Sequence, residues 1–231
     1  MTNNSDFILN EIRSYPQGGE LLRLNGKGIV ELPADIKNLT TVGTLDLSDN
    51  LLTSLPPEIG EMKELKKLNL SRNNLSDLPK ELGKLPKLHS IYLSGNRFTK
   101  IPEALFNLSS LWELDLSSNS IDILPDEFYN LTSLTSLNLS KNKIATISAE
   151  LANLKTLLHL DISNNMITSL PFDETWSSIV DNRFVSVVFY GNPLLPFPPE
   201  KLSMSNEKDF WDFGWMKYFR EIKNHQKNNS R

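Results

Sequence analysis

Asparagine recurs along this chain at a nearly constant spacing. Six asparagines lie at intervals of 23 residues, and a seventh follows the last of them after 27; they are Asn50, Asn73, Asn96, Asn119, Asn142, Asn165 and Asn192. Around each one the sequence repeats the same apolar pattern, as in LDLSDN at 45–50 and LNLSRN at 68–73. A period of this length is the signature of a solenoid, in which every repeat forms one coil.

The apolar pattern within each repeat indicates a short strand. Side chains alternate between the two faces of a strand, so Leu45 and Leu47 point into a core while Thr44 and Asp46 point to the surface. The asparagine follows where the chain turns out of the strand. We expect its amide to bond backbone groups of the turn and of the adjacent coil, because buried backbone groups need partners. The seven asparagines are therefore predicted to form a structural ladder.

The second half of the repeats carries a proline and apolar residues spaced by three. Proline can start a helical turn without loss of a useful donor, and the three-residue spacing suits a short helix or 3₁₀ turn. Ser148 replaces this proline in one repeat, which we interpret as tolerated drift. The prolines are Pro56, Pro79, Pro102, Pro125 and Pro171.

This combination resembles the leucine-rich-repeat superfamily. The L-P-x-E-I-x-x-L wording, which 55–62 matches except for methionine at its last position, is similar to the intracellular Ras-group type with 23-residue repeats. The resemblance implies an α/β leucine-rich-repeat solenoid. In such a fold a curved parallel β-sheet lines the concave face, short helices or 3₁₀ turns line the convex face, and helical caps close both ends.

The ends of the chain depart from the repeat, as the ends of an open solenoid must. We predict an N-terminal capping helix within 1–20, started by Asp6 and carrying Ile8 and Ile12. About eight repeats follow in 21–198, and 199–231 forms a C-terminal cap helix and tail. Lys27 stands where the ladder pattern expects asparagine and marks its edge, because a lysine side chain cannot accept hydrogen bonds.

Two segments near the C-terminus allow more than one interpretation. The residues 172–182 lengthen one repeat and form either a contact loop or slack. A helix predicted over 209–224 carries Trp211, Trp215, Tyr218, Phe219 and Ile222 on one face. We expect this helix to cover the last coil, since the burial of several aromatic rings contributes several kcal/mol. The alternative is a membrane-peripheral anchor aided by nearby lysines.

Composition limits the partners. The net charge of −4 argues against nucleic-acid binding, which needs a basic surface. The chain has no cysteine, which favours a reducing compartment and excludes a cysteine nucleophile. No apolar run approaches the ~18 residues of a membrane span, and the first residues lack the layout of a signal peptide. We therefore expect a cytoplasmic protein, with an exported effector that lacks a classical signal peptide as the alternative.

The predicted binding surface is the exposed face of the strands. Lys67, Tyr92, Trp112, Glu113 and His159 depart from the repeat wording. Near the middle of the arc, Tyr92 and Trp112 lie beside the carboxylates of Glu113 and Asp115, which is the composition of a recognition hot spot. An alternative places the Trp112 ring on a neighbouring coil. The full set of predicted contact residues is Asp46, Lys67, Asn69, Tyr92, Trp112, Glu113, Asp115, Asn138, His159 and Asp161.

Catalysis is not expected. His89, His159 and His225 fall in separate repeats without ligand spacing, so neither a metal site nor a cofactor is predicted. The glycines around 18–28 lack any phosphate-binding fingerprint, and no histidine–serine pair in a triad-like group is anticipated.

These observations predict a non-catalytic protein–protein interaction module. The Ras-group resemblance implies an intracellular scaffold or signalling adaptor, with a small GTPase or another signalling protein as partner. This step is an analogy, because a fold does not determine a partner. The alternatives are a pathogen-delivered effector that binds a host protein and a membrane-peripheral protein held by its C-terminal helix.

Overall fold

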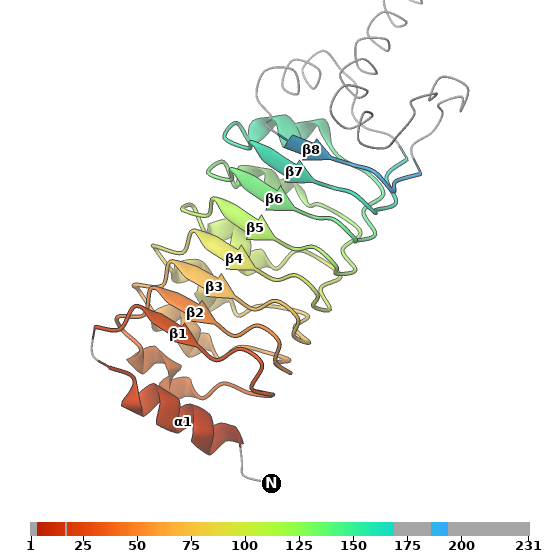
Figure 1. Ribbon diagram of the computed structural model, residues 1–231. Coiled ribbons are helices and arrows are strands. Elements are labelled where there is room, and N and C mark those ends of the chain that lie inside the picture. The colour runs from red at the N-terminus through yellow and green to blue at the C-terminus, as the bar shows by residue number, and fades with distance from the viewer. Residues whose placement is uncertain (1–3, 17, 169–185, 194–231) are drawn as a thin grey trace, which may run out of the picture.

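In the part of the chain that the structure describes, eight short strands form one parallel sheet in chain order (Figure 1). The computed structural model describes residues 4–16, 18–168 and 186–193. The strands are β1 (Leu21–Arg23), β2 (Thr44–Asp46), β3 (Lys67–Asn69), β4 (Ser90–Tyr92), β5 (Glu113–Asp115), β6 (Ser136–Asn138), β7 (His159–Asp161) and β8 (Ser186–Val188).

The strand register follows the sequence period. Leu45 pairs with Leu68, Leu68 with Ile91 and Ile91 with Leu114, each step advancing one 23-residue repeat. The step from Leu160 in β7 to Val187 in β8 is 27 residues, which accommodates the change in spacing before Asn192. Part of the extra length, 169–185, lies outside the described residues, so the interpretation of 172–182 stays a prediction.

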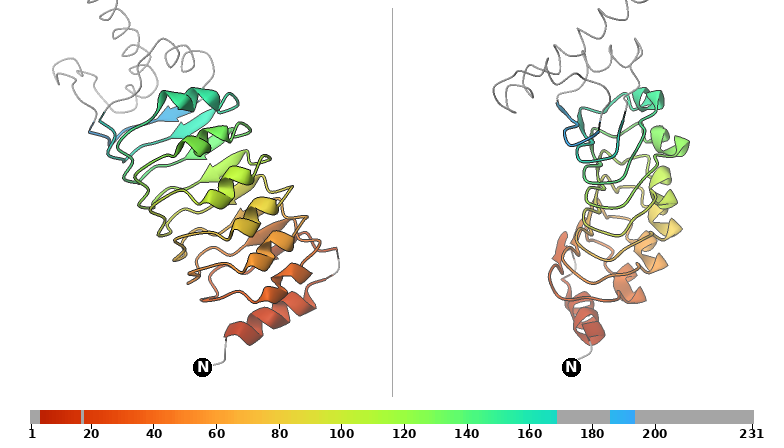
Figure 2. Two further views of the ribbon diagram at one scale, coloured as in Figure 1. Left: turned by 180° about the vertical axis from the view of Figure 1, so that it is seen from behind. Right: turned by 90° about the vertical axis from the view of Figure 1, so that its right-hand side faces the viewer.

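Short 3₁₀ helices occupy the side of the coils opposite the strands (Figure 2). A proline with extended backbone dihedral angles immediately precedes each of the first five helices. Ser148 precedes the sixth, and its Oγ accepts a hydrogen bond from the Glu150 N–H at 3.1 Å. The serine therefore supplies a side-chain cap. The helices are η1 (Ala34–Asn38), η2 (Pro57–Glu61), η3 (Lys80–Lys84), η4 (Glu103–Asn107), η5 (Asp126–Asn130) and η6 (Ala149–Asn153).

One continuous apolar core runs between the strands and the 3₁₀ helices. The central residue of each strand from β2 to β7 is at most 1% exposed, as are Leu47, Leu70 and Leu93 just after the strands. Each coil buries these side chains mainly against its neighbours, so stability accumulates from coil to coil. The predicted curved solenoid, with its sheet on the inner side of the arc and helices on the outer side, is confirmed (Figure 2).

A helix covers the N-terminal end of the solenoid. Helix α1 (Asn4–Ser14) buries Ile8 and Ile12 in the core and contacts η1. It begins two residues before Asp6, so the prediction that Asp6 starts the helix is wrong. The predicted C-terminal helix and the boundary at 198/199 lie outside the described residues and stay predictions.

Candidate functional site

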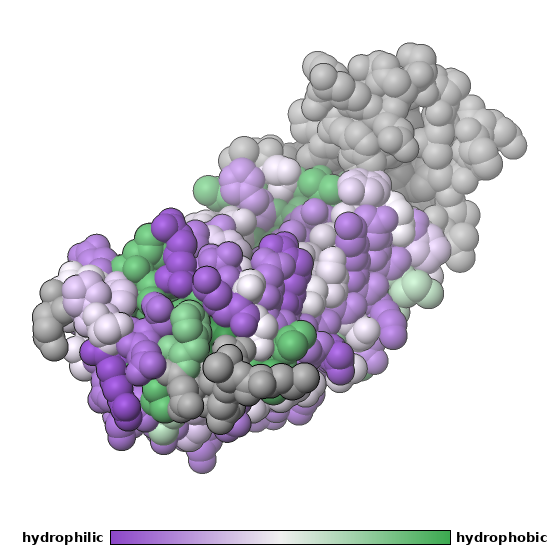
Figure 3. Space-filling model, turned by 60° about the horizontal axis from the view of Figure 1, so that its bottom comes forward, coloured by the Kyte–Doolittle hydropathy of each residue, from purple (hydrophilic) through white to green (hydrophobic). Residues whose placement is uncertain are grey.

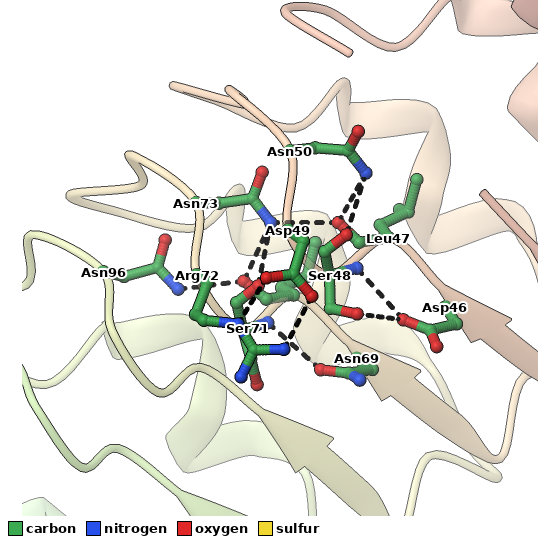
Figure 4. Close-up of polar contacts among 11 residues, drawn as sticks. Asp46, Leu47, Ser48, Asp49, Asn50, Asn69, Ser71, Arg72, Asn73 and Asn96 are labelled. Carbon is green, nitrogen blue, oxygen red and sulfur yellow. Dashed lines mark hydrogen bonds and ion pairs between the residues drawn. The ribbon is translucent and has the colours of Figure 1, made fainter. Parts of the chain in front are cut away.

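The repeated asparagines hold consecutive coils together just after the strands (Figure 4). Asn73 is 6% exposed; its Nδ2 donates to the carbonyls of Leu47 and Leu70 at 3.0 Å, and its Oδ1 accepts the Leu52 N–H at 3.0 Å. The other ladder residues, Asn50, Asn96, Asn119, Asn142, Asn165 and Asn192, make the equivalent bonds. The ladder therefore holds consecutive coils in register. This register positions the exposed side of the sheet, which we call the strand face.

The residue before each ladder asparagine has a left-handed backbone. Its φ is 57° at Asp49, 55° at Arg72 and 55° at Ser118, and it is 67° where glycine stands at Gly95. Only glycine adopts this conformation without steric cost. At Asp49 and Arg72 the side chains form a two-pronged ion pair across the coils, which lowers the pKa of Asp49 through the hydrogen bond from Arg72 (Figure 4).

The side chain of the last residue of most strands bonds the turn that follows the strand, a structural role that its repeat position alone does not reveal. Oδ1 of Asp46 accepts the backbone N–H and the hydroxyl of Ser48, at 3.0 Å and 2.7 Å (Figure 4). Such bonds stabilise the turn that follows the strand. The same backbone bond recurs in four other coils. There the N–H groups of four serines donate to Oδ1 of the residue two positions earlier; the pairs are Ser71 and Asn69, Ser117 and Asp115, Ser140 and Asn138, and Ser163 and Asp161. One oxygen of each predicted contact residue in this set is thus committed to the fold.

Tyr92 replaces that residue in β4 and connects three strands. Lys67 in β3 places Nζ 4.7 Å from the centroid of the Tyr92 ring, a cation–π contact. On the other side the Tyr92 hydroxyl donates to Oε2 of Glu113 in β5 at 2.6 Å. Burial and this hydrogen bond to a carboxylate raise the pKa of Tyr92 above its usual value.

Trp112 begins the next part of the site, immediately before β5. Its indole stacks on the His89 imidazole with the ring centroids 4.1 Å apart and an interplanar angle of 27°. Its Nε1–H donates to Ser90 Oγ at 3.2 Å, and 48% of the residue stays exposed. Trp112 therefore packs on the neighbouring coil and is at the same time available at the surface.

His89 and Ser90 were missed as members of the site. They lie one repeat before Trp112 and Glu113, at the same positions of the repeat. Their repeat position therefore indicates that they lie beside these two residues. Burial, and then the positive charge of Lys66, lower the pKa of His89. We call Lys67, His89, Ser90, Tyr92, Trp112 and Glu113 the central cluster.

A contact between histidine and serine differs from the sequence expectation. His89 Nδ1 lies 3.0 Å from Ser90 Oγ. Ser90 is only 3% exposed, and its oxygen also accepts the Trp112 indole N–H, so it is poorly placed to attack a substrate. The pair serves to position the two rings.

The remaining predicted contact residues lie in the sheet outside the central cluster, two of them directly beside Tyr92. Asp46 belongs to β2, two strands before Tyr92, and Asn69 lies beside Tyr92 in β3. Asp115 pairs with Tyr92, and Asn138 and Asp161 continue this row through β6 and β7. His159 is exposed at the start of β7, two strands from Glu113. The structure thus brings Lys67, Tyr92 and Glu113 into contact, places Trp112 on His89 and Ser90, and leaves the others as neighbours in the sheet.

The face of the molecule that Figure 3 shows is mixed in polarity. Figure 3 shows hydrophobic residues as separate patches among hydrophilic ones. Within the described ranges, no group of three or more histidine, aspartate or glutamate side chains is arranged to hold a metal ion. In the same part of the chain no helix has the length and apolar character needed to cross a membrane.

Comparison with known proteins gives matches to repeat families. A family model described as "Leucine-rich repeat region" matches residues 58–188, and one described as "Leucine Rich Repeat" matches 42–62. A search of curated proteins found no match to the sequence.

Solved structures share the architecture. A leucine-rich-repeat protein of Leptospira interrogans is 30% identical with a TM-score of 0.61, over 79% of this chain and 52% of that chain. The plant peptide hormone receptor RGFR1, in complex with RGF2, is 34% identical with a TM-score of 0.61, over 80% and 34%.

The ectodomain of the receptor kinase GASSHO1/SCHENGEN3 from Arabidopsis thaliana, in complex with CASPARIAN STRIP INTEGRITY FACTOR 2, is 30% identical with a TM-score of 0.65, over 78% and 22%. The present chain spans about half the length of the Leptospira chain and smaller fractions of the plant receptors. Because the repeat-region model covers more than half of the sequence, this chain belongs to the leucine-rich-repeat family.

Proposed function

We propose that this protein is a non-catalytic binding module that holds a protein partner on its strand face, with the central cluster at the middle of the contact. The observation that carries the proposal is the half-exposed Trp112, fixed by its stack on His89 and its bond to Ser90. Tryptophan and tyrosine, together with arginine, are enriched at the energetic centres of protein interfaces. A solenoid also offers an extended surface on its inner side.

The central cluster is already ordered, which favours tight binding. Lys67, Tyr92 and Glu113 are linked by a cation–π contact and a hydrogen bond. Side chains that are held before a partner arrives lose less conformational freedom when it binds. The two plant receptors named above were each solved in complex with another molecule, RGF2 or CASPARIAN STRIP INTEGRITY FACTOR 2, which supports a binding role by likeness of fold.

The Ras-group wording of the repeats extends the proposal to an intracellular signalling adaptor. The prolines before η2 to η5 and the regular 23-residue register support this subtype. A small GTPase is the first partner class to test, in its GDP-loaded and GTP-loaded forms. A preference for one nucleotide state supports an adaptor, and equal absence of binding across a panel of GTPases removes this extension without affecting the binding module.

The binding module is tested by affinity capture with matched variants. Lysate from the source cell is passed over the wild-type protein and over the Tyr92→Ala, Trp112→Ala, Asp115→Lys triple variant, after circular dichroism has shown both to be folded. Quantitative mass spectrometry then compares the bound proteins. The proposal predicts a partner that only the wild type retains. Equal retention of every bound protein by both forms contradicts a site on the strand face.

A further inference from the structure

In the described part of the chain, one face of the Trp112 ring stacks on His89, and no second ring or cation contacts the indole. His89 precedes β4 and Trp112 precedes β5, so their stack at 4.1 Å runs from coil to coil and leaves the other indole face directed towards β6. The corresponding residue before β6 is Thr135, whose hydroxyl donates to the Trp112 carbonyl at 3.0 Å. A threonine turned to the backbone is too short to form a third layer of the stack. This agrees with the 48% exposure of Trp112.

We propose that this face of Trp112 binds an arginine side chain of the partner, with the guanidinium plane stacked on the indole above Thr135. The inference rests on the proposed binding function and specifies the chemistry that the partner presents. Guanidinium groups stack on aromatic faces and are weakly hydrated compared with ammonium groups, so a flat site selects arginine over lysine.

The charges around Trp112 favour a cation that approaches over β6. Strand-face positions are the residue before each strand and the first and third residues of the strand. At these positions β5 to β7 carry no lysine or arginine. Their aspartate and glutamate residues there are Glu113, Asp115 and Asp161. Lys66 and Lys67 lie at β3, on the far side of the His89–Trp112 stack. The charged strand-face residues on the two sides of β6 are therefore acidic, while those at β3 are basic.

The protein already uses the proposed chemistry one strand away. Lys67 places its ammonium 4.7 Å from the Tyr92 ring centroid, and the Tyr92 hydroxyl donates to Glu113. This arrangement puts a cation, an aromatic ring and a carboxylate in contact. Trp112, next to Glu113 in sequence, offers a second aromatic face, on which no cation of the described residues lies.

Leu158 completes the surroundings of the proposed arginine. It precedes β7 and is 37% exposed. Since neighbouring strands lie ~4.8 Å apart, Leu158 is about two strand spacings from Trp112 and borders the space over Thr135 from the other side. The aliphatic stem of an arginine can pack on Leu158 while its guanidinium group lies on the indole.

The test uses a phage-displayed library of random short peptides, selected on the full-length wild-type protein. Parallel selections use Thr135→Phe, which fills the third layer with the protein's own ring, and Thr135→Val, which keeps the size of threonine. Peptides enriched on wild type and on Thr135→Val, but not on Thr135→Phe, are predicted to share an arginine. Denaturation curves of the three proteins check that each is folded.

Synthetic versions of the enriched peptides then replace the arginine with citrulline, which is planar and neutral, or with lysine. We expect citrulline to weaken binding about tenfold, and lysine to weaken it several-fold, from the loss of cation–π and charge contacts. Trp112→Leu and Glu113→Gln in the protein should weaken arginine peptides and leave citrulline peptides nearly unchanged.

Three results overturn the inference. Peptides that depend on the strand face but share no arginine, or that tolerate citrulline with less than about a twofold loss, contradict it and leave the binding module intact. Failure to enrich any peptide whose binding depends on Trp112 also contradicts it. If the captured protein partner likewise ignores Trp112, the proposed function fails as well.

Discussion

The hydroxyl of Tyr92 donates a 2.6 Å hydrogen bond to Oε2 of Glu113 and joins β4 to β5 across the strand face. Tyr92 stands at a strand position where Asp46, Asn69, Asp115, Asn138 and Asp161 bond the following turn instead. In the coil that contains β4, Tyr92 makes a hydrogen bond to the neighbouring coil in place of a side-chain bond to its own turn. The centre of the proposed site is therefore distinguished from its neighbours by its contacts.

The ionisation of Tyr92 should report this bond. Burial and the Glu113 hydrogen bond raise its pKa above 10.0, and Lys67 opposes the shift. We expect Glu113→Gln to lower the pKa of Tyr92 and Lys67→Met to raise it further. Absorbance titrations, each compared with the same protein carrying Tyr92→Phe, measure both shifts. Two shifts of the same sign would contradict the arrangement of Lys67, Tyr92 and Glu113.

The His89–Trp112 stack should make stability depend on pH. Burial and nearby Lys66 lower the pKa of His89 below 6.5, so the unfolded chain binds this proton more readily than the folded protein. The contribution of His89 is thus complete above about pH 6.5 and declines as the pH falls through the lowered pKa. Urea denaturation of wild type and His89→Gln across this range should show a difference that narrows in acid. A constant difference would show that His89 is not held neutral.

The asparagine ladder should carry much of the stability. Asn142 is 8% exposed, accepts the Ile121 N–H and donates to the Leu116 and Leu139 carbonyls. Asn142→Ala leaves these buried groups without partners and should cost about 2–4 kcal/mol of unfolding free energy. Asn130→Ala, at an exposed position at the end of η5, is the matched control. Equal losses in the two variants would contradict a special role for the ladder.

The left-handed position before each asparagine predicts a stabilising change. Ser118 has φ 55° and is exposed. Ser118→Gly should therefore stabilise the protein by up to about 1 kcal/mol, because glycine adopts this backbone without strain. Gly95→Ala should destabilise it, since φ is 67° and a Cβ there would lie 3.3 Å from Arg72 Cγ. Thermal unfolding of both variants measures the effects, and a loss of stability in Ser118→Gly would contradict the strain argument.

The architecture could be predicted from the sequence, because every coil must bury an apolar side chain at the same positions of the repeat. Leucines at the central strand position have the same surroundings in every coil, so their spacing predicts Leu45 beside Leu68 and Leu68 beside Ile91. The 3₁₀ helices follow from proline, whose backbone is restricted before the chain folds. The sequence does not show that Ser148 caps η6, since a side-chain cap depends on a rotamer that sequence spacing does not specify.

The site was predictable only in part. Tyr92, Trp112 and Glu113 stand out because they break the repeat wording. The His89 stack and the Ser90 bond depend on the direction in which Trp112 leans, which the repeat position does not determine. The turn bonds of Asp46 and its equivalents were also underestimated, because the same oxygen can face solvent or the backbone.

The most direct test of the binding module is the dissociation constant of the captured partner, measured by isothermal titration calorimetry with matched variants. One set, Trp112→Ala and Glu113→Lys, alters the strand face. The other set, Glu103→Lys and Asn130→Ala, alters exposed residues of the 3₁₀ helices on the opposite side. We predict that the strand-face changes weaken binding at least about tenfold and that the opposite-side changes alter it less than about twofold. The reverse pattern, with losses confined to the 3₁₀ helices, would contradict the account.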